Sequence, residues 1–256
     1  MSLVIHITSD THIERYYPYV PDPKSIIPVS CDILVLAGDI GHCQYWQQYS
    51  AFIRQTCQKF PYVIIIPGNH EYYIRGKCGL TIVQINDKLK KLAESIDNLL
   101  FLNDSYVAID SCEVIIFGTV LWSYIHKNKL PKYIPIRYGN KYINAVEWNY
   151  LHNQAMLSLY EAMAVAKEKN YKLIVISHYC PSFEDTIPPE YRNKNNDLYC
   201  SDLDHLLEDE QIQVWYYGHT GHNIMRHPPG KTCLYGNQHY EKDYKENLFV
   251  TIKKTT

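Results

Sequence analysis

The stretch that decides the fold is YVIIIPGNHE, residues 62–71. A short continuous apolar run bounded by turn signals is typical of a strand buried on both faces, as in a sheet that helices cover. Asn69 then offers a neutral oxygen ligand, and His70 offers a proton donor that titrates near neutrality. An ordinary Pro-Gly-Asn turn explains the same letters. This motif alone therefore leaves a catalytic and a structural interpretation open.

Other polar clusters follow apolar runs in the same way. They are Asp10-Thr11-His12, Gly38-Asp39, Ser177-His178, Gly218-His219 and His222. In a mainly parallel sheet, polar residues just past the carboxyl ends of the strands converge on one crevice. Each cluster alone has an ordinary explanation, such as a capped turn or a hydrogen-bonded structural histidine. Together they supply carboxylate, amide oxygen and imidazole, the ligand mix that holds two divalent metal ions.

Apolar runs and helix-period segments alternate along the first half of the chain. The expected strands are residues 3–7, 33–36, 62–66, 106–109, 114–117, 173–176 and 214–217, and the expected helices are residues 46–60, 82–96 and 145–167. No helix fits between the runs of residues 98–117, so a strand pair is expected there. An alternating first half and a hairpin-rich second half predict an α+β fold, with two sheets packed together and helices outside.

The end of the chain carries further expected elements. Residues 231–235 and 248–252 resemble antiparallel strands that close the domain, and Ser201 with Asp204 resembles an N-cap that opens a helix. Residues 123–144 and 181–197 are expected to be loops at the rim of the site. Because no linker or repeat divides the chain, residues 1–256 are expected to form a single domain.

Composition narrows the possible partners and compartment. The net charge of −2 comes without a basic block, so long nucleic acids are not expected to bind. No signal peptide or apolar run of about 18 residues occurs, so neither export nor a membrane span is expected. The eight cysteines lack C-x-x-C spacing and are expected to be free thiols. These features predict a cytoplasmic protein.

The polar clusters resemble the calcineurin-like metallophosphoesterases, whose pattern is D-x-H, G-D, G-N-H-E/D, H and G-H-x-H. The resemblance runs from Ile5 to the end and includes residues 118–122, GTVLW, and 177–181, SHYCP, which are similar to segments of small prokaryotic-type members. It implies a four-layer αββα fold, a double β-sandwich flanked by helices. It also implies that Asp10, His12 and Asp39 hold one metal ion, while Asp39, Asn69, His178 and His219 hold a second.

The resemblance further implies that Asp39 bridges the two metals, that His70 assists the leaving group, and that Asn69 also touches phosphate. One position departs from the pattern, because Gly221 stands where the family has its last histidine. Either a one-residue bulge still delivers His222 to the first metal, or that site lacks a ligand. The donors suit manganese first, with iron, zinc, nickel or magnesium as further candidates.

The expected activity is hydrolysis of a phosphomonoester or phosphodiester through a metal-bridging hydroxide. A catalytically weak or inactive binding or scaffold protein is the alternative, and the shifted His222 favours it. A nuclease and a protein phosphatase rank lower, because a basic run and specific recognition segments are not apparent. Five residues could face the site from loops, although each is better explained as an ordinary surface residue: Arg15, Tyr16, Tyr124, Arg137 and Arg192.

Overall fold

The computed structural model describes residues 2–74, 79–126, 130–131, 134–189, 196–227, 232–241, 243–246 and 248–253. Its strands are β1 (Ser2–Thr8), β2 (Ile33–Ala37), β3 (Tyr62–Ile66), β4 (Leu99–Phe101), β5 (Ser105–Ile109), β6 (Val114–Thr119), β7 (Arg137–Tyr138), β8 (Lys141–Tyr142), β9 (Lys172–Ser177), β10 (Ile212–Tyr217), β11 (Met225–Arg226), β12 (Cys233–Gly236) and β13 (Phe249–Lys253). The α-helices are α1 (Pro23–Ile26), α2 (Trp46–Lys59), α3 (Ile82–Glu94) and α4 (Ala145–Lys169). Short 3-10 helices are η1 (Ile13–Tyr16), η2 (Cys43–Tyr45), η3 (His70–Tyr72), η4 (Asp110–Cys112), η6 (Asn196–Leu198) and η7 (Asp204–Glu208).

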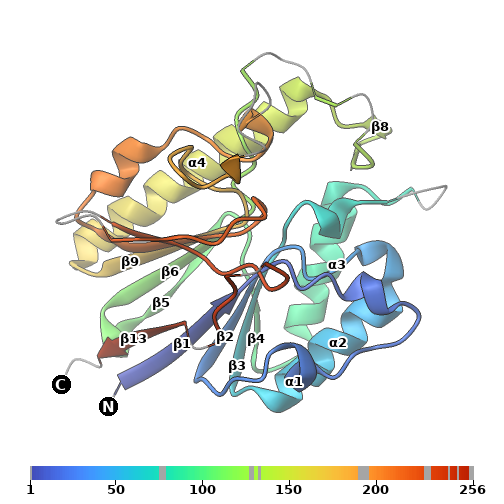
Figure 1. Ribbon diagram of the computed structural model, residues 1–256, viewed down its shortest axis with the longest axis horizontal. Helices are drawn as coiled ribbons and strands as arrows, with labels where there is room; N and C mark the ends of the chain where they lie inside the picture. Colours follow the sequence, from blue (N-terminus) through green and yellow to red (C-terminus); the bar gives the residue numbers. More distant parts are fainter. Residues whose placement is uncertain are drawn as a thin grey trace.

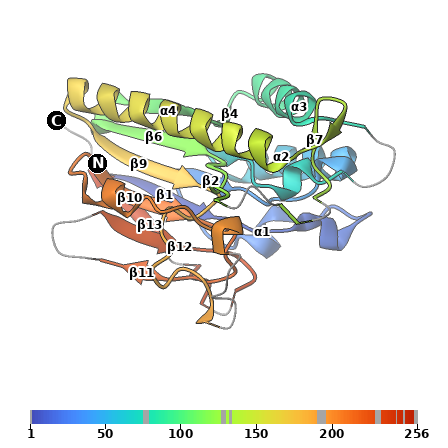
Figure 2. The ribbon, with the colours of Figure 1, turned by 90° about the horizontal axis from the view of Figure 1, so that it is seen from above.

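Two sheets pack face to face with helices on their outer sides (Figure 1). One sheet has the order β13-β1-β2-β3-β4, and the other has the order β11-β12-β10-β9-β6-β5. Strands β1 to β4 run parallel, as do β6, β9, β10 and β12. Helices α2 and α3 cover the first sheet and α4 covers the second (Figure 2). The predicted two-sheet sandwich flanked by helices is therefore confirmed.

Alternation along each strand builds this layered core. In β3, Ile64 and Ile66 join the apolar cluster between the sheets, whereas Val63 and Ile65 join the cluster beneath the helices. The same division holds in β9, where Ile174 and Ile176 face inward. Because both faces are buried, the strands read as continuous apolar runs rather than as alternating ones.

The long helices begin and end at local signals. Asn144 caps the start of α4 by accepting hydrogen bonds from Val146 and Glu147, and the Glu147 side chain accepts from Asn144 in return. Thr81 and Gln84 form the same reciprocal box at α3. Asn170 ends α4 in the left-handed conformation. The helices predicted over 46–60, 82–96 and 145–167 are thus confirmed within two residues at each end.

Two predictions about the end of the chain are wrong. Strands β12 and β13 do not pair with each other: β12 runs parallel to β10, whereas β13 pairs antiparallel with β1 in the other sheet. The chain crosses between the sheets after β12, where the Asn237 amide donates to the Ile7 carbonyl. Lys231, predicted to begin this strand, lies outside the described residues.

The expected helix after Ser201 is instead the 3-10 helix η7, whose start has no side-chain cap. The Ser201 hydroxyl is occupied elsewhere, because it accepts a hydrogen bond from the Tyr124 backbone. The described parts of the loops predicted over 123–144 and 181–197 are confirmed, apart from the hairpin of the two-residue strands β7 and β8 and the short η6. Residues 127–129, 132–133 and 190–195 lie outside the described residues.

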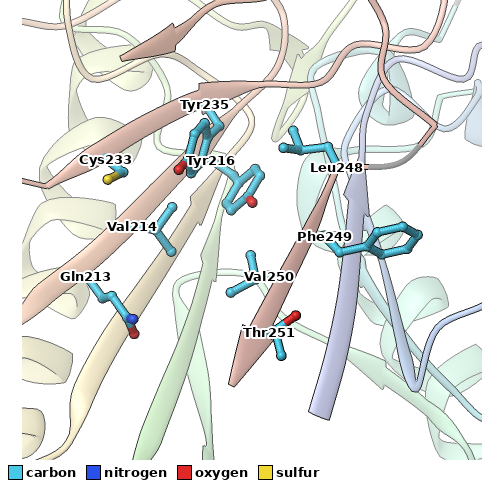
Figure 3. Close-up of a pocket in the computed structure, with 9 residues that line it drawn as sticks. All are labelled: Gln213, Val214, Tyr216, Cys233, Tyr235, Leu248, Phe249, Val250 and Thr251. Atoms are coloured by element: carbon cyan, nitrogen blue, oxygen red, sulfur yellow. The ribbon is translucent and has the colours of Figure 1, made fainter. Parts of the chain in front are cut away.

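The two sheets separate at one edge and leave an apolar cavity of about 220 Å³ between β10, β12 and β13 (Figure 3). It shares no lining residue with the polar clusters of the strand ends.

Seven cysteines of the described chain are free, as predicted, and Cys78 lies outside the described residues. Among the described residues, no helix is long and apolar enough to cross a membrane.

Candidate metal centre

The predicted site residues follow the carboxyl ends of five strands from both sheets. Asp10, Asp39 and Asn69 come after β1, β2 and β3, while His178 and His219 come after β9 and β10. Because β1–β3 belong to one sheet and β9 and β10 to the other, the site lies where the two sheets meet.

Asp39 lies at the centre of this arrangement. One group of closely spaced donor atoms joins Asp39 to His12 and His70, and another joins it to His178 and His219. The Nε2 atom of His178 lies 3.2 Å from Asp39 Oδ1 and 3.1 Å from Asn69 Oδ1. The carboxylate is therefore shared by two donor groups, which is the placement that a bridging ligand requires.

The histidines expected to bind metal have their other ring nitrogen engaged. The Nδ1 atom of His178 contacts the Ala37 carbonyl at 3.1 Å, and Nδ1 of His12 contacts Glu14 Oε1 at 2.9 Å. In His219 it is Nε2 that meets a carbonyl, that of Leu198, at 3.2 Å. A partner of this kind fixes the tautomer and directs the free lone pair of the opposite nitrogen. The donor set therefore fits divalent cations.

Glycine lets the ligands approach the backbone closely. A Cβ atom at Gly38 would collide with the His178 ring, and one at Gly68 would collide with Asp39 and His178. Four expected ligands also have left-handed backbone angles, with φ of 57° at Asp10, 43° at His12, 50° at Asp39 and 69° at His219. Such strained conformations cluster at functional sites, where the surrounding structure enforces them.

Burial and opposite charges set the protonation of these groups. Burial opposes a charge on His178, but the Asp39 carboxylate outweighs it and raises the pKa of His178 to about 9. Burial also opposes a charge on His12, whose pKa the Glu14 hydrogen bond and nearby carboxylates raise to about 9. Burial, helped by the charge of His178, lowers the pKa of His219 to about 3. The histidine charges hold the pKa of Asp39 well below its usual range, although burial acts in the opposite direction.

Glu71 connects the turn that carries Asp39 to the turn that carries Asn69. Its carboxylate accepts hydrogen bonds from the backbone N–H groups of Asp39, Ile40, Gly41 and Gly68, at 2.7–3.3 Å. Burial and the charge of Asp39 raise the pKa of Glu71 to about 7. The sequence placed Glu71 in the GNHE motif without a role, and the structure shows that it ties the turn after β2 to the turn after β3.

A cavity of about 300 Å³ opens above the site. Its lining contains Asp10, His12, Asp39, Asn69, His70 and His219, joined by Arg15, Tyr73, Tyr199, Gly221, Gln238, Tyr240 and Glu241. His178 is completely buried below these residues. Of the five loop residues considered at the rim, Arg15 lines the cavity, whereas Tyr16, Tyr124 and Arg137 do not. Arg192 lies outside the described residues.

His222 is the one predicted ligand that does not join the cavity lining, whereas its neighbour Gly221 does. The His222 carbonyl accepts hydrogen bonds from Tyr217, Thr220 and Gln238. Its imidazole acts electrostatically on Glu241, which lines the cavity. The role of His222 as a metal ligand therefore stays a prediction.

Several residues of the site went unrecognised in the sequence. Glu14 stands two residues after His12, continuing the spacing of Asp10 and His12, and His42 stands three residues after Asp39. These short spacings from predicted ligands were the sequence signals that could have identified Glu14 and His42 as site residues. Gln238, Tyr240 and Glu241 come from the crossing between the sheets and carried no recognisable pattern.

Comparison with known proteins agrees with this geometry. The family model of the calcineurin-like phosphoesterases matches residues 3–223. An uncharacterised protein of Acanthamoeba polyphaga mimivirus is 28% identical over 254 residues, covering 85% of this chain and 84% of that protein.

Among solved structures, a phosphopantetheinyl hydrolase from Mycobacterium tuberculosis has a TM-score of 0.63 at 12% identity, covering 92% of this chain and 88% of its own. A dimetal phosphatase from Danio rerio has a TM-score of 0.53 at 10% identity, covering 99% of each chain. At these identities the structural likeness shows a shared fold.

Proposed function

The chain belongs to the calcineurin-like phosphoesterase family, and on this premise we propose that it is a dinuclear metal-dependent hydrolase of a small phosphomonoester or phosphodiester. The observation that carries the proposal is the position of Asp39, whose carboxylate is common to two separate groups of donor atoms. A carboxylate shared in this way can bind two adjacent cations, one through each oxygen.

In the proposed centre, Asp10, His12 and Asp39 hold the first cation, with His222 as the further ligand predicted from sequence. Asp39, Asn69, His178 and His219 hold the second. Mixed nitrogen and oxygen donors suit borderline cations, with manganese as the first candidate. Two bound cations supply Lewis acidity toward the phosphoryl oxygens and lower the pKa of a water molecule.

The protein side chains orient the substrate and supply a proton. His70 is 30% exposed, lies at the cavity wall, and has its Nε2 atom 3.8 Å from Asp39 Oδ2. This position suits donation of a proton to the leaving oxygen. The Asn69 amide donates to the Tyr73 hydroxyl at 3.0 Å, which turns its carbonyl oxygen toward His178. The remaining amide hydrogen of Asn69 is available to a phosphate oxygen.

The cavity limits the substrate to a small or flexible compound. Its volume of about 300 Å³ lies at the lower end of the range for small-molecule sites, roughly 300–1,000 Å³. Arg15 adds a positive charge to the wall, and its guanidinium stacks on Tyr240 with 4.2 Å to the ring centroid. These features support a small anionic substrate.

The test is turnover of chromogenic phosphomonoesters and phosphodiesters by the purified protein, supplied in turn with Mn²⁺, Zn²⁺, Ni²⁺ and Mg²⁺. Asp39→Asn is expected to lower kcat/KM by at least about a thousandfold, because it removes the negative charge and one of the two oxygens of the shared ligand. The exposed Asp202→Asn is the matched control and is expected to retain activity. Absence of turnover with every cation, in protein that is folded, would favour a binding or scaffold protein of this family.

His70 is tested separately through the leaving group. His70→Asn is expected to slow hydrolysis by about 10²–10⁴-fold for alkyl phosphates, whose leaving oxygen needs a proton, and much less for nitrophenyl phosphates. Equal losses for both substrate types would remove the proton-donor role from His70 while leaving the metal centre in place.

A further inference from the structure

A second group of metal-binding atoms adjoins the proposed dinuclear centre. Glu14 of η1, His42 just before η2 and His70 at the start of η3 bring one donor atom each to a common point. The Nε2 atom of His42 lies 3.1 Å from His70 Nδ1 and 3.5 Å from Glu14 Oε1. His70 Nδ1 and Glu14 Oε1 are 4.0 Å apart.

These separations suit a small tetrahedral cation. With bonds of about 2.0–2.1 Å, two donors on a four-coordinate Zn²⁺ lie roughly 3.3–3.4 Å apart. The three observed distances bracket this value. A hydrogen bond between the two imidazoles accounts for the shortest distance, but it does not explain why a carboxylate approaches both rings.

Glu14 has unused capacity for a ligand. Its Oε1 atom contacts Nδ1 of His12 at 2.9 Å, and a carboxylate oxygen has a second lone pair. Its Oε2 atom is buried and has no hydrogen-bond partner among the described residues. A buried carboxylate oxygen without a partner is costly, and a cation held by both oxygens of Glu14 would relieve that cost.

Aromatic side chains hold the two imidazoles in place. Tyr73 stacks on His70 with 4.4 Å between ring centroids, and Tyr45 lies parallel to His42 at 6.2 Å. The side chains of Glu14 and His42 are only 15% and 12% exposed. The donors are therefore largely withdrawn from solvent and restricted in orientation.

We propose that Glu14, His42 and His70 form a third, inhibitory cation site that takes a borderline cation such as Zn²⁺. The inhibitory consequence rests on the proposed function, in which His70 donates a proton. A cation on Nδ1 of His70 engages the ring that the proposed function uses as its proton donor. Occupancy thus removes the proton donor without displacing the dinuclear centre.

The test is a direct measurement of bound metal. The full chain is loaded with Mn²⁺ and dialysed against micromolar Zn²⁺, and both metals are counted by mass spectrometry. Wild type is expected to hold one metal equivalent more than His42→Ala. His205→Ala removes an exposed imidazole of η7 and is expected to match wild type. Equal metal content in wild type and His42→Ala overturns the proposal.

A second variant and a second readout guard against a folding defect. His42→Asn keeps a polar side chain that is too short to place a donor at the position of Nε2, and its thermal unfolding is compared with that of wild type. Excess Zn²⁺ is expected to inhibit wild type at a concentration at least tenfold lower than it inhibits this variant. Identical inhibition of the two folded proteins also overturns the proposal.

The outcomes separate this site from the proposed function. Two manganese equivalents with phosphoester turnover, but no additional zinc, leave the dinuclear enzyme intact and refute the third site. Zinc binding that depends on His42, in a protein that turns over no phosphoester with any cation, supports the third site and refutes the proposed activity.

Discussion

His178 Nε2 lies 3.2 Å from Asp39 Oδ1, although the two residues follow strands of different sheets. The contact joins the turn after β2 to the end of β9. The site is therefore complete only when the two sheets are packed together, because neither sheet carries both donor sets. Packing of the two sheets against each other is therefore required to complete the metal centre.

This contact predicts that metal binding releases protons. The pKa values of His178 and His12 are both raised to about 9, so both rings are protonated at pH 7.5. A histidine must be neutral to bind a metal. Loading the chelator-treated protein at pH 7.5 is expected to release close to two protons from these histidines, and one more when the bridging water becomes hydroxide, measured by calorimetry in buffers of different ionisation enthalpy.

The released protons can be assigned to individual histidines by substitution. His178→Asn is expected to lower the number of protons released by about one. His219 is expected to contribute none, because its pKa is lowered to about 3 and the ring is already neutral. Metal binding without proton release would contradict the raised pKa values of His178 and His12, because both rings would then be neutral before the metal binds.

Glu71→Gln is predicted to destabilise the protein by about 2–4 kcal/mol. The carboxylate accepts four backbone N–H groups, two at each oxygen. The glutamine amide presents N–H donors to two of them and leaves these unpaired in a buried site. Urea unfolding at pH 5 measures the loss, because above pH 7 the variant also escapes the cost of charging Glu71, whose pKa burial and the charge of Asp39 raise to about 7. The exposed Glu94→Gln is expected to stay within about 0.5 kcal/mol of wild type. Equal stability of the two variants would contradict the role given to Glu71.

Strand positions and ligand positions were predictable because both depend on local sequence. A run such as residues 62–66 is buried on both faces, and the polar residues that follow it must lie at the sheet edge. The order of the clusters then placed Asp10, Asp39, Asn69, His178 and His219 near one crevice.

The contributions of Glu14, His42 and Glu241 depend on tertiary packing, which local patterns do not encode. The contact of Glu14 with His42 forms because η1 follows β1 and η2 follows β2, and these strands are parallel neighbours in one sheet. The partners of β12 and β13 were also missed, because the choice of a pairing partner leaves no signal in either strand. Ser201 was predicted to cap a helix, but its hydroxyl instead accepts a hydrogen bond from the Tyr124 backbone, 77 residues away.

The first metal site makes a prediction about Gly221 and His222. If His222 is the last ligand, as predicted from sequence, His222→Ala loses one metal equivalent. Gly221 lines the cavity, with φ of +67°, a conformation that histidine tolerates. A Cβ added there would meet nothing closer than Glu241 Oε1, at 3.6 Å.

Gly221→His, introduced into the His222→Ala protein, is therefore expected to restore the lost equivalent. Metal content after dialysis measures both steps. Two equivalents retained by His222→Ala alone would show that the first metal does not use this histidine.

Asp104→Asn is predicted to stabilise the protein at neutral pH. Burial raises the pKa of Asp104 to about 6, although the Thr119 hydroxyl donates to it at 2.5 Å. A carboxyl whose folded pKa exceeds its unfolded value adds stability below the unfolded value, near pH 4, and that stability is lost as pH rises through about 6. Asparagine accepts the same hydrogen bond and tolerates the φ of 51° at this position.

The variant is expected to exceed wild type by about 2–3 kcal/mol at pH 8 and to match it near pH 4, as measured by urea unfolding. The exposed Asp202→Asn should leave the pH profile unchanged, and a constant difference between Asp104→Asn and wild type across this range would show that Asp104 is already ionised without cost.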